Sequence, residues 1–196
     1  MPRWSFVLAL ILAASLRATP AAAQAPAPGW DLAQLMHGFA DVRTSSARFV
    51  ERKYLHMLTA PVEDSGTLFY RAPDQLRKDT LQPQIEHLNV DHDLLTIERE
   101  GKTQTLHLDD YPQIWAIIES IRGTLAGDRA ALERYYILHL EGSSGDWKMS
   151  LEPRDSKIKD LVRSILIFGS GAHIKRIETD ERDGDRTEMT ITEDAP

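Results

Sequence analysis

The chain has 196 residues, of which 30 are acidic and 23 basic, giving a formal charge of −7 at pH 7. This balance argues against binding to nucleic acid and against electrostatic docking on anionic lipid head groups. The absence of cysteine excludes disulfides, thiol chemistry and cysteine metal sites. The length fits one domain with a substantial core.

Residues 1–23 are predicted to be a cleaved signal peptide. Arg3 gives a short positive start, residues 6–16 are apolar, and Ala21-Ala22-Ala23 is a small-residue cleavage site. The apolar run is shorter than the roughly 20 residues that span a bilayer. We expect cleavage after Ala23, with Ala25 as the second candidate, and a mature protein in the periplasm. Removal of the two arginines of the signal leaves 21 basic and 30 acidic residues, a formal charge of −9.

After an alanine- and proline-rich tether over residues 24–30, helical and extended patterns alternate. Asp31 is a favourable N-cap for a helix that reaches about residue 42. Isoleucines at helical spacing between residues 114 and 121 predict an amphipathic helix that ends near Gly127. A second short helix is expected over residues 128–135.

Alternation of polar and apolar residues between turn signals predicts eleven strands. Dipeptides such as Pro73-Asp74 and Glu100-Gly101 mark the turns between neighbours, which favours an antiparallel meander. The expected strands cover residues 46–57, 63–71, 74–82, 84–91, 93–100, 102–108, 136–142, 146–152, 162–168, 173–181 and 186–192.

Eleven strands are too many for a flat open sheet, which tends to curl or close. We therefore predict a mainly β (α+β) fold, in which a curved antiparallel sheet forms an incomplete β-barrel of about eleven strands with a helical lid. Such a cup has an apolar inner face, which suits binding a hydrophobic molecule rather than transforming it.

Two polar clusters are candidates for reactive centres, and neither has the spacing that its chemistry needs. The Gly169-Ser170-Gly171 segment with His173 lacks the G-x-S-x-G elbow of a serine hydrolase. We predict no enzymatic activity, no metal and no cofactor. The second polar cluster, of histidine and aspartate, matches no helical metal-ligand pattern. Its members are His87, Asp91, His92, Asp93, His107, Asp109 and Asp110.

Several short motifs occur in an order found in a known family. They are A-x-F-x-E at 47–51, S-G-x-L-x-Y-x-x-P-D at 65–74, Q-P at 82–83 and L-x-P at 151–153, followed by a strand, an Asp-Gly turn at 183–184 and a strand. In this respect the chain resembles the periplasmic outer-membrane lipoprotein carriers, the LolA-like family, as a divergent branch. The resemblance covers most of the mature chain.

The resemblance implies a monomeric lipid-binding domain over residues 31–196, an open barrel with a helical lid. Its cavity would take the acyl chains of a lipoprotein from an inner-membrane release complex and pass them to an outer-membrane acceptor. The physical need for such a carrier is large, because a 16-carbon chain exposed to water costs on the order of 12 kcal/mol.

One position departs from the family pattern. Well-known members have an arginine directly before the proline that corresponds to Pro73, and this arginine latches the lid. Here Ala72 has that position and Arg71 lies one residue earlier, a shift that sends a strand side chain to the opposite face. Arg71 is the candidate for a latch or release role. The departure leaves a second cargo open, a non-protein lipid such as a glycolipid or polyene carried to the outer membrane.

We expect the cavity wall to combine one face of the early strands with one face of the inserted helix. Leu68, Tyr70 and Ala72 share a strand face, and Phe49 is placed against the same space. The predicted ligand-binding set is Phe49, Leu68, Tyr70, Leu81, Ile114, Trp115, Ile118 and Ile121.

Overall fold

The structure is a computed structural model that describes residues 30–194. The predicted signal peptide and residues 24–29 of the predicted tether lie outside the described residues. Among the helices of residues 30–194, none has the length and apolar character needed to cross a bilayer.

Eleven antiparallel strands form one continuous sheet in the order β6-β5-β4-β3-β2-β1-β11-β10-β9-β8-β7. The first and last strands of the chain meet in its middle, where Phe49 pairs with Ile191, while β6 and β7 form its two edges. The strands are β1 (Thr44–Tyr54), β2 (Val62–Arg71), β3 (Gln75–Gln82), β4 (Glu86–Asp91), β5 (Leu94–Arg99), β6 (Lys102–His107), β7 (Tyr136–Ser143), β8 (Asp146–Pro153), β9 (Val162–Ser170), β10 (His173–Glu181) and β11 (Arg186–Glu193).

The predicted helices form with the expected caps. Asp31 accepts a hydrogen bond of 2.9 Å from the Gln34 amide at the start of α1 (Leu32–Ala40). Asp128 caps α3 (Arg129–Tyr135) in the same way through the Ala131 amide, and α2 (Pro112–Leu125) precedes it. A 3₁₀ turn, η1 (Leu108–Asp110), and the one-turn helix α4 (Ser156–Lys159) were not predicted, because a single turn is too short to show a helical period.

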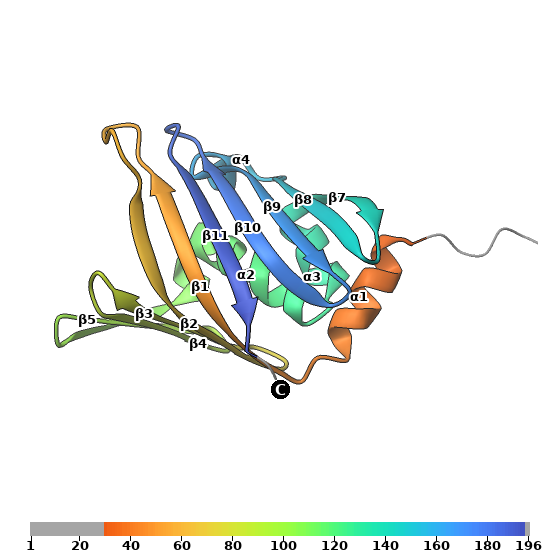
Figure 1. Cartoon of the computed structure of the whole chain (residues 1–196), viewed down its shortest axis with the longest axis horizontal. Coiled ribbons are helices and arrows are strands. Elements are labelled where there is room, and N and C mark those ends of the chain that lie inside the picture. The colour runs from red at the N-terminus through yellow and green to blue at the C-terminus, as the bar shows by residue number, and fades with distance from the viewer. Residues whose placement is uncertain (1–29, 195–196) are drawn as a thin grey trace, which may run out of the picture.

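The curved sheet has its helices on the concave side, so that the predicted fold class is confirmed. Figure 1 shows α2 and α3 behind the strands β8–β11, with α1 at the end of the sheet where β9 turns into β10. At that end Gly38 of α1 lies against the Ala172 side chain.

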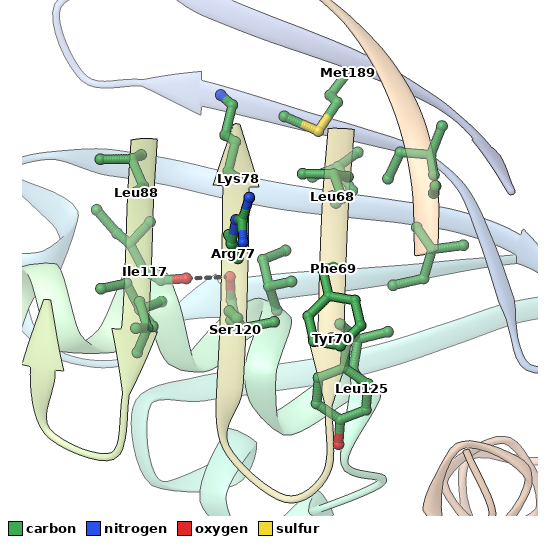
Figure 2. A pocket seen from close by; sticks show the side chains of 18 of the residues that line it. Leu68, Phe69, Tyr70, Arg77, Lys78, Leu88, Ile117, Ser120, Leu125 and Met189 are labelled. Atoms are coloured by element: carbon green, nitrogen blue, oxygen red, sulfur yellow. Dashed lines mark hydrogen bonds between the residues drawn. The ribbon is translucent and has the colours of Figure 1, made fainter. Parts of the chain in front are cut away.

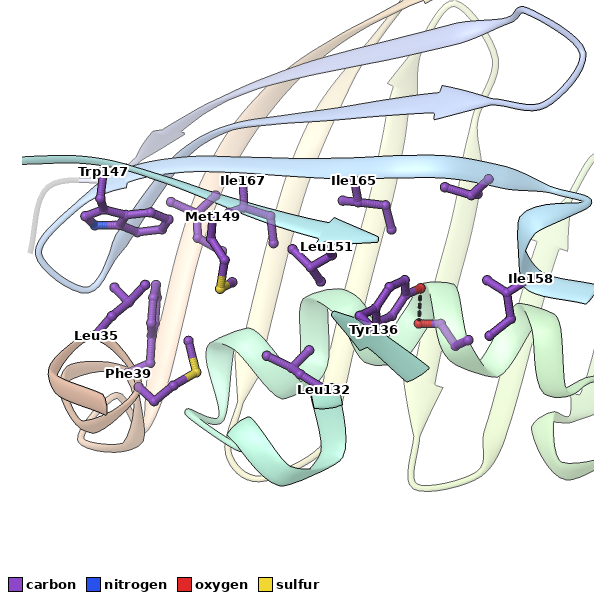
Figure 3. Close-up of a cluster of buried hydrophobic side chains, with 14 residues drawn as sticks. Leu35, Phe39, Leu132, Tyr136, Trp147, Met149, Leu151, Ile158, Ile165 and Ile167 are labelled. Carbon is purple, nitrogen blue, oxygen red and sulfur yellow. Dashed lines mark hydrogen bonds between the residues drawn. The ribbon is translucent and has the colours of Figure 1, made fainter. Parts of the chain in front are cut away.

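The main hydrophobic core fills one half of the molecule, between β7–β10 and the helices α1, α2 and α3. Trp147 lies at the end of this core beside α1 (Figure 3), with its ring edge-on to Phe39 and its indole N–H donating to the Gly171 carbonyl at 2.9 Å. On the helical side the Tyr136 hydroxyl donates to the Ala116 carbonyl of α2 (Figure 3). Large residues with almost no exposed surface fill the space between them: Leu35, Phe39, Leu132, Tyr136, Trp147, Met149, Leu151, Ile165 and Ile167.

Candidate functional site

The other half of the concave face encloses a cavity of about 560 Å³ between the sheet and α2. This volume lies within the range of about 300–1,000 Å³ that is typical of small-molecule sites. Most of its wall is aliphatic: Ala47, Leu68, Leu76, Leu88, Val90, Leu95, Ile97, Leu106, Ile114, Ile117, Ile118, Ile121, Leu125, Ile165, Ile174, Ile177, Met189 and Ile191.

Strand register explains how residues distant in sequence form this wall. Tyr70 of β2 pairs with Leu76 of β3, which pairs with Val90 of β4 and then Leu95 of β5 and Leu106 of β6. Side chains of directly paired residues point to the same face of a sheet, so the five form one inward row. Each belongs to a different strand, and the row exists only once the sheet has curled.

The opposite wall is the isoleucine face of α2. Ser120, the polar residue that this helix contributes to the cavity wall, bonds within the helix, since its hydroxyl donates to the Ile117 carbonyl at 2.6 Å (Figure 2). Side chains that bond back to their own helix present little polar surface to a neighbour. The helix therefore offers a mainly apolar surface to whatever occupies the cavity.

The aromatic ring of Tyr70 lies in the same wall. Its side chain is buried, and among the described residues its hydroxyl has no hydrogen-bond partner. Burial is the main cause that raises the pKa of Tyr70, with Asp74 adding to it, so the hydroxyl is neutral at physiological pH. Figure 2 shows this hydroxyl beside Leu125, at one end of the cavity.

Charged groups gather at the opposite end. The Lys78 ammonium donates to the Glu51 carboxylate at 2.7 Å, and Lys53 lies 3.5 Å from the same oxygen. Lys53 also donates to Asp64 at 2.6 Å. Burial by itself lowers the pKa of Lys53, but Asp64 and Glu51 outweigh it and raise that pKa above 10.5. The cavity is thus mainly apolar, with this charged cluster at one end and one further carboxylate in its wall, that of Glu193, which pairs with Ala47.

Five of the eight predicted binding residues line this cavity: Leu68, Tyr70, Ile114, Ile118 and Ile121. They come from β2 and α2, which the fold brings to face each other across the cavity.

The other three predicted residues do not line it. Phe49 is buried because its ring packs over Gly66 and is covered by Lys78, whose ammonium lies 4.9 Å from the ring centre. Leu81 is 48% exposed, since Leu76 and Lys78 set the inward positions of β3 and Leu81 falls on the outward one. Trp115 packs beside Val90 and Leu95, with the Arg122 guanidinium 4.7 Å from its ring.

Arg71, the candidate latch, is also outside the cavity wall. It ends β2 as an exposed residue, with its guanidinium 5.6 Å from the Phe69 ring. Neighbours along a strand point to opposite faces, and Tyr70 takes the inward position. Nothing in the described part of the chain pairs Arg71 with the lid helices.

Sequence reasoning missed the contribution of β3, β4 and β5, namely Leu76, Lys78, Leu88, Val90, Leu95 and Ile97. The pairs Leu88/Val90 and Leu95/Ile97 each have the spacing of two that marks one strand face, and this signal was available. It does not say whether that face meets a packed core or a cavity.

The fold brings the residues of the two candidate polar clusters only partly together. Asp91 and His92 lie with Asp74 so that one ligand atom of each falls within 4.8 Å of the others, and His56, Asp183 and Asp185 form a similar group. His173 faces Ser170 across the β9–β10 hairpin, but its ring Nδ1 lies 2.6 Å from the Glu193 carboxylate.

Comparison with known structures gives matches at low sequence identity. A LolA superfamily protein from Nitrosomonas europaea is 11% identical, with 83% of this chain and 93% of that chain covered and a TM-score of 0.43. The Mycobacterium tuberculosis lipoprotein LppX is 13% identical, with 84% and 96% covered and a TM-score of 0.43. In the Pseudomonas aeruginosa MucA/MucB complex, the matching chain is 14% identical, with 84% and 56% covered and a TM-score of 0.46.

A comparison with curated protein sequences finds no similar protein. Residues 21–195, however, match the sequence pattern of a family described as "outer membrane lipoprotein carrier protein LolA-like". This match includes the whole sheet, the lid helices and every residue of the cavity wall. The chain therefore belongs to the outer membrane lipoprotein carrier protein LolA-like family.

Proposed function

We propose that this protein is a periplasmic carrier that shields the acyl chains of lipoproteins in its cavity while they move from the inner to the outer membrane. The observation that carries the proposal is the mainly aliphatic cavity between α2 and the concave face of the sheet, where β1–β6 and β9–β11 line it. Membership in the lipoprotein-carrier family supports the choice of cargo. Partners are then an inner-membrane release complex and an outer-membrane acceptor, and the carrier acts as a monomer without a cofactor.

The energetics of transfer favour this role. Burial of each methylene gains about 0.8 kcal/mol, so a cavity that encloses most of an acyl chain lowers the cost of crossing water by several kcal/mol. Leu68, Leu88 and Ile97 are only half-buried. An apolar chain in the cavity would cover them, and both surfaces would leave water together.

Binding of an apolar fluorescent dye, and its displacement by a diacylated lipopeptide, test the proposal. We expect Leu88→Asn to weaken dye binding by at least about tenfold, because it places an amide in the apolar wall. Val50→Asn is the matched control, since Val50 lies on β1 at an exposed position outside the cavity. A wild-type protein that binds neither dye nor lipopeptide would sink the carrier hypothesis.

A non-protein lipid, such as a glycolipid or polyene, remains the second candidate cargo. The specific observation in its favour is that Arg71 does not reach the cavity and Ala72 has the position of the family's latch arginine. Mass spectrometry of ligand extracted from protein purified from its own periplasm decides between the two. Acyl chains attached to peptide support the lipoprotein cargo, and free lipid supports the alternative.

The proposal assigns no catalysis to the protein. An esterase would hydrolyse acyl esters, and single substitutions of Ser170, His173 and His92 would abolish that turnover. We expect no turnover of a p-nitrophenyl acyl ester above the rate of a boiled sample. Saturable hydrolysis that the Ser170→Ala variant lacks would require an enzymatic role instead.

A further inference from the structure

Lys78 lies in the cavity wall among aliphatic side chains, beside its carboxylate partner Glu51, which also lines the cavity. It pairs with Leu68 on one side and with Leu88 on the other, and Leu88 pairs in turn with Ile97. All four line the cavity. Figure 2 shows Lys78 at the opposite end of the cavity from Tyr70 and Leu125.

The carboxylate that neutralises Lys78 already has a second cation beside it. Glu51 is 6% exposed, and its Oε2 atom lies 2.7 Å from the Lys78 ammonium and 3.5 Å from that of Lys53. Lys53 has Asp64 as a further partner at 2.6 Å. A cationic ligand group would therefore meet a carboxylate with little surface left and two ammonium groups beside it.

The Lys78 ammonium, by contrast, has donors to spare. A lysine offers three N–H donors, and within residues 30–194 Lys78 makes one side-chain hydrogen bond, the one to Glu51. Its side chain is 22% exposed and lines the cavity, whereas Lys53 does not line it. The Phe49 ring below the ammonium holds it in place by a cation–π contact at 4.9 Å.

We propose that Lys78 forms a head-group subsite, which binds acceptor oxygens at the polar end of an acyl-chain ligand. The chain then extends along Leu68 and Leu88 toward Tyr70. Binding sites fix the orientation of apolar ligands with a few well-placed polar groups, and Lys78 has that position here. The ligand class is an acyl amphiphile with carboxylate, phosphate or ester oxygens next to the chain. This inference rests on the proposed carrier function and specifies the polar end of its cavity.

The test compares ligands with the same 16-carbon chain and different heads. Palmitate carries a carboxylate, 1-palmitoyl-lysophosphatidylglycerol a phosphate, and monopalmitoylglycerol an uncharged ester, while the dye N-phenyl-1-naphthylamine carries no oxygen. We expect Lys78→Met to weaken palmitate and the lysophospholipid about tenfold. The ester should lose about threefold, because hydrogen bonds to charged acceptors are roughly twice as strong, and dye affinity should not change.

Two further variants separate a direct contact from a disturbed ion cluster. Lys53→Met removes the other cation beside Glu51 and should leave palmitate affinity within about twofold, because Lys53 does not line the cavity. Glu51→Gln removes the competing negative charge beside Lys78 and should raise palmitate affinity. This opposite sign keeps the test valid even if Lys78→Met folds poorly.

Equal losses for all four ligands in Lys78→Met, or equal effects of Lys53→Met and Lys78→Met on palmitate, would overturn the head-group subsite. In both cases dye binding by the wild-type protein would still support the carrier. If the wild-type protein bound none of the four ligands, the carrier function would fail together with the subsite.

Discussion

The β7–β10 half of the sheet and the β2–β6 half both turn apolar side chains toward the helices. The first half is mostly packed, whereas the second leaves a cavity beside a smaller buried cluster of Val90, Leu95 and Leu108. In β8 the inward residues Trp147, Met149 and Leu151 are at most 2% exposed, packed by α1 and α3. In β2–β5 the inward residues Leu68 and Leu88 are only half-buried and face a cavity. Close packing is the normal state of a protein interior, so the cavity half is the surface that we propose binds the ligand.

The helix α2 belongs to both halves and shows the same division on its own surface. Ala116 and Gly123, on one side, lie against Tyr136 and Leu132. On the other side the isoleucines line the cavity. The small residues let the helix approach its neighbours closely in the packed half. The isoleucines on the other side form the wall of the cavity between the helix and the sheet.

The largest expected effect comes from removing a side chain of the packed half. Trp147→Ala should lower the free energy of unfolding by about 3–5 kcal/mol, because it leaves a large cavity. It also removes the hydrogen bond to the Gly171 carbonyl and the contact with Phe39. Urea denaturation followed by circular dichroism measures the change. A loss below about 1 kcal/mol would show that this half is not the structural core.

The matching truncation in the cavity half should change ligand affinity more than stability. Leu88→Ala is expected to lower the free energy of unfolding by only about 1 kcal/mol, since Leu88 is half-exposed and already borders empty space. Affinity for an acyl ligand should fall by roughly tenfold, because one apolar contact in the wall is lost. If the stability losses of Leu88→Ala and Trp147→Ala were equal, the division into a packed and a ligand-binding half would be wrong.

The pH dependence of stability is expected to come partly from the packed side of α2. Glu119 is buried, and this burial raises the pKa of its carboxyl above the ordinary value of 4.5, although the contact with Arg122 at 2.5 Å counteracts it. An acid with a raised native pKa stabilises the fold fully only below its unfolded pKa, and that contribution is lost as the pH rises through the native pKa.

Glu119→Gln has no such titration, and its amide oxygen can still accept from Arg122. Its stability relative to wild type should therefore be most favourable at pH 7 and decline as the pH falls toward 4.5. Denaturation curves across this range measure the difference. Glu133→Gln, at an exposed position of α3, is the control. A constant difference between Glu119→Gln and wild type at all pH values would contradict the expectation.

Most of the packed half and all eleven strands were predictable from local patterns. Leu35 and Phe39 of α1 and the alternation in β8 give the period of one buried face. In the cavity half the strand faces have a local signal, but that signal does not tell which residues line a cavity and which pack in a core. Phe49 has the right strand face, yet Gly66 lets its ring pack down and Lys78 covers it.

The other residues that were predicted wrongly or not predicted also depend on how distant strands pair and curve. Leu88 and Ile97 have strand periodicity, but only the curl of the sheet toward α2 places them in a cavity rather than a core. Leu81 is as apolar as Leu76, and its outward position follows from the pairing of β3 with β2 and the shift of register at Ser65 and Gly66. An apolar residue in a strand predicts a buried face, but whether another side chain or a ligand buries it is a tertiary property.

The smallest predicted effect concerns the hydroxyl of Tyr70, at the end of the cavity opposite Lys78 (Figure 2). This hydroxyl is buried without a hydrogen-bond partner among the described residues. Its removal therefore breaks no hydrogen bond and relieves a desolvation cost. Tyr70→Phe should leave the free energy of unfolding unchanged or raise it by up to about 1 kcal/mol. Palmitate affinity should also stay within about twofold, since the head group is expected at the Lys78 end. A tenfold loss of affinity without loss of stability would instead place a polar group of the ligand beside Tyr70 and reverse the direction in which the chain enters the cavity.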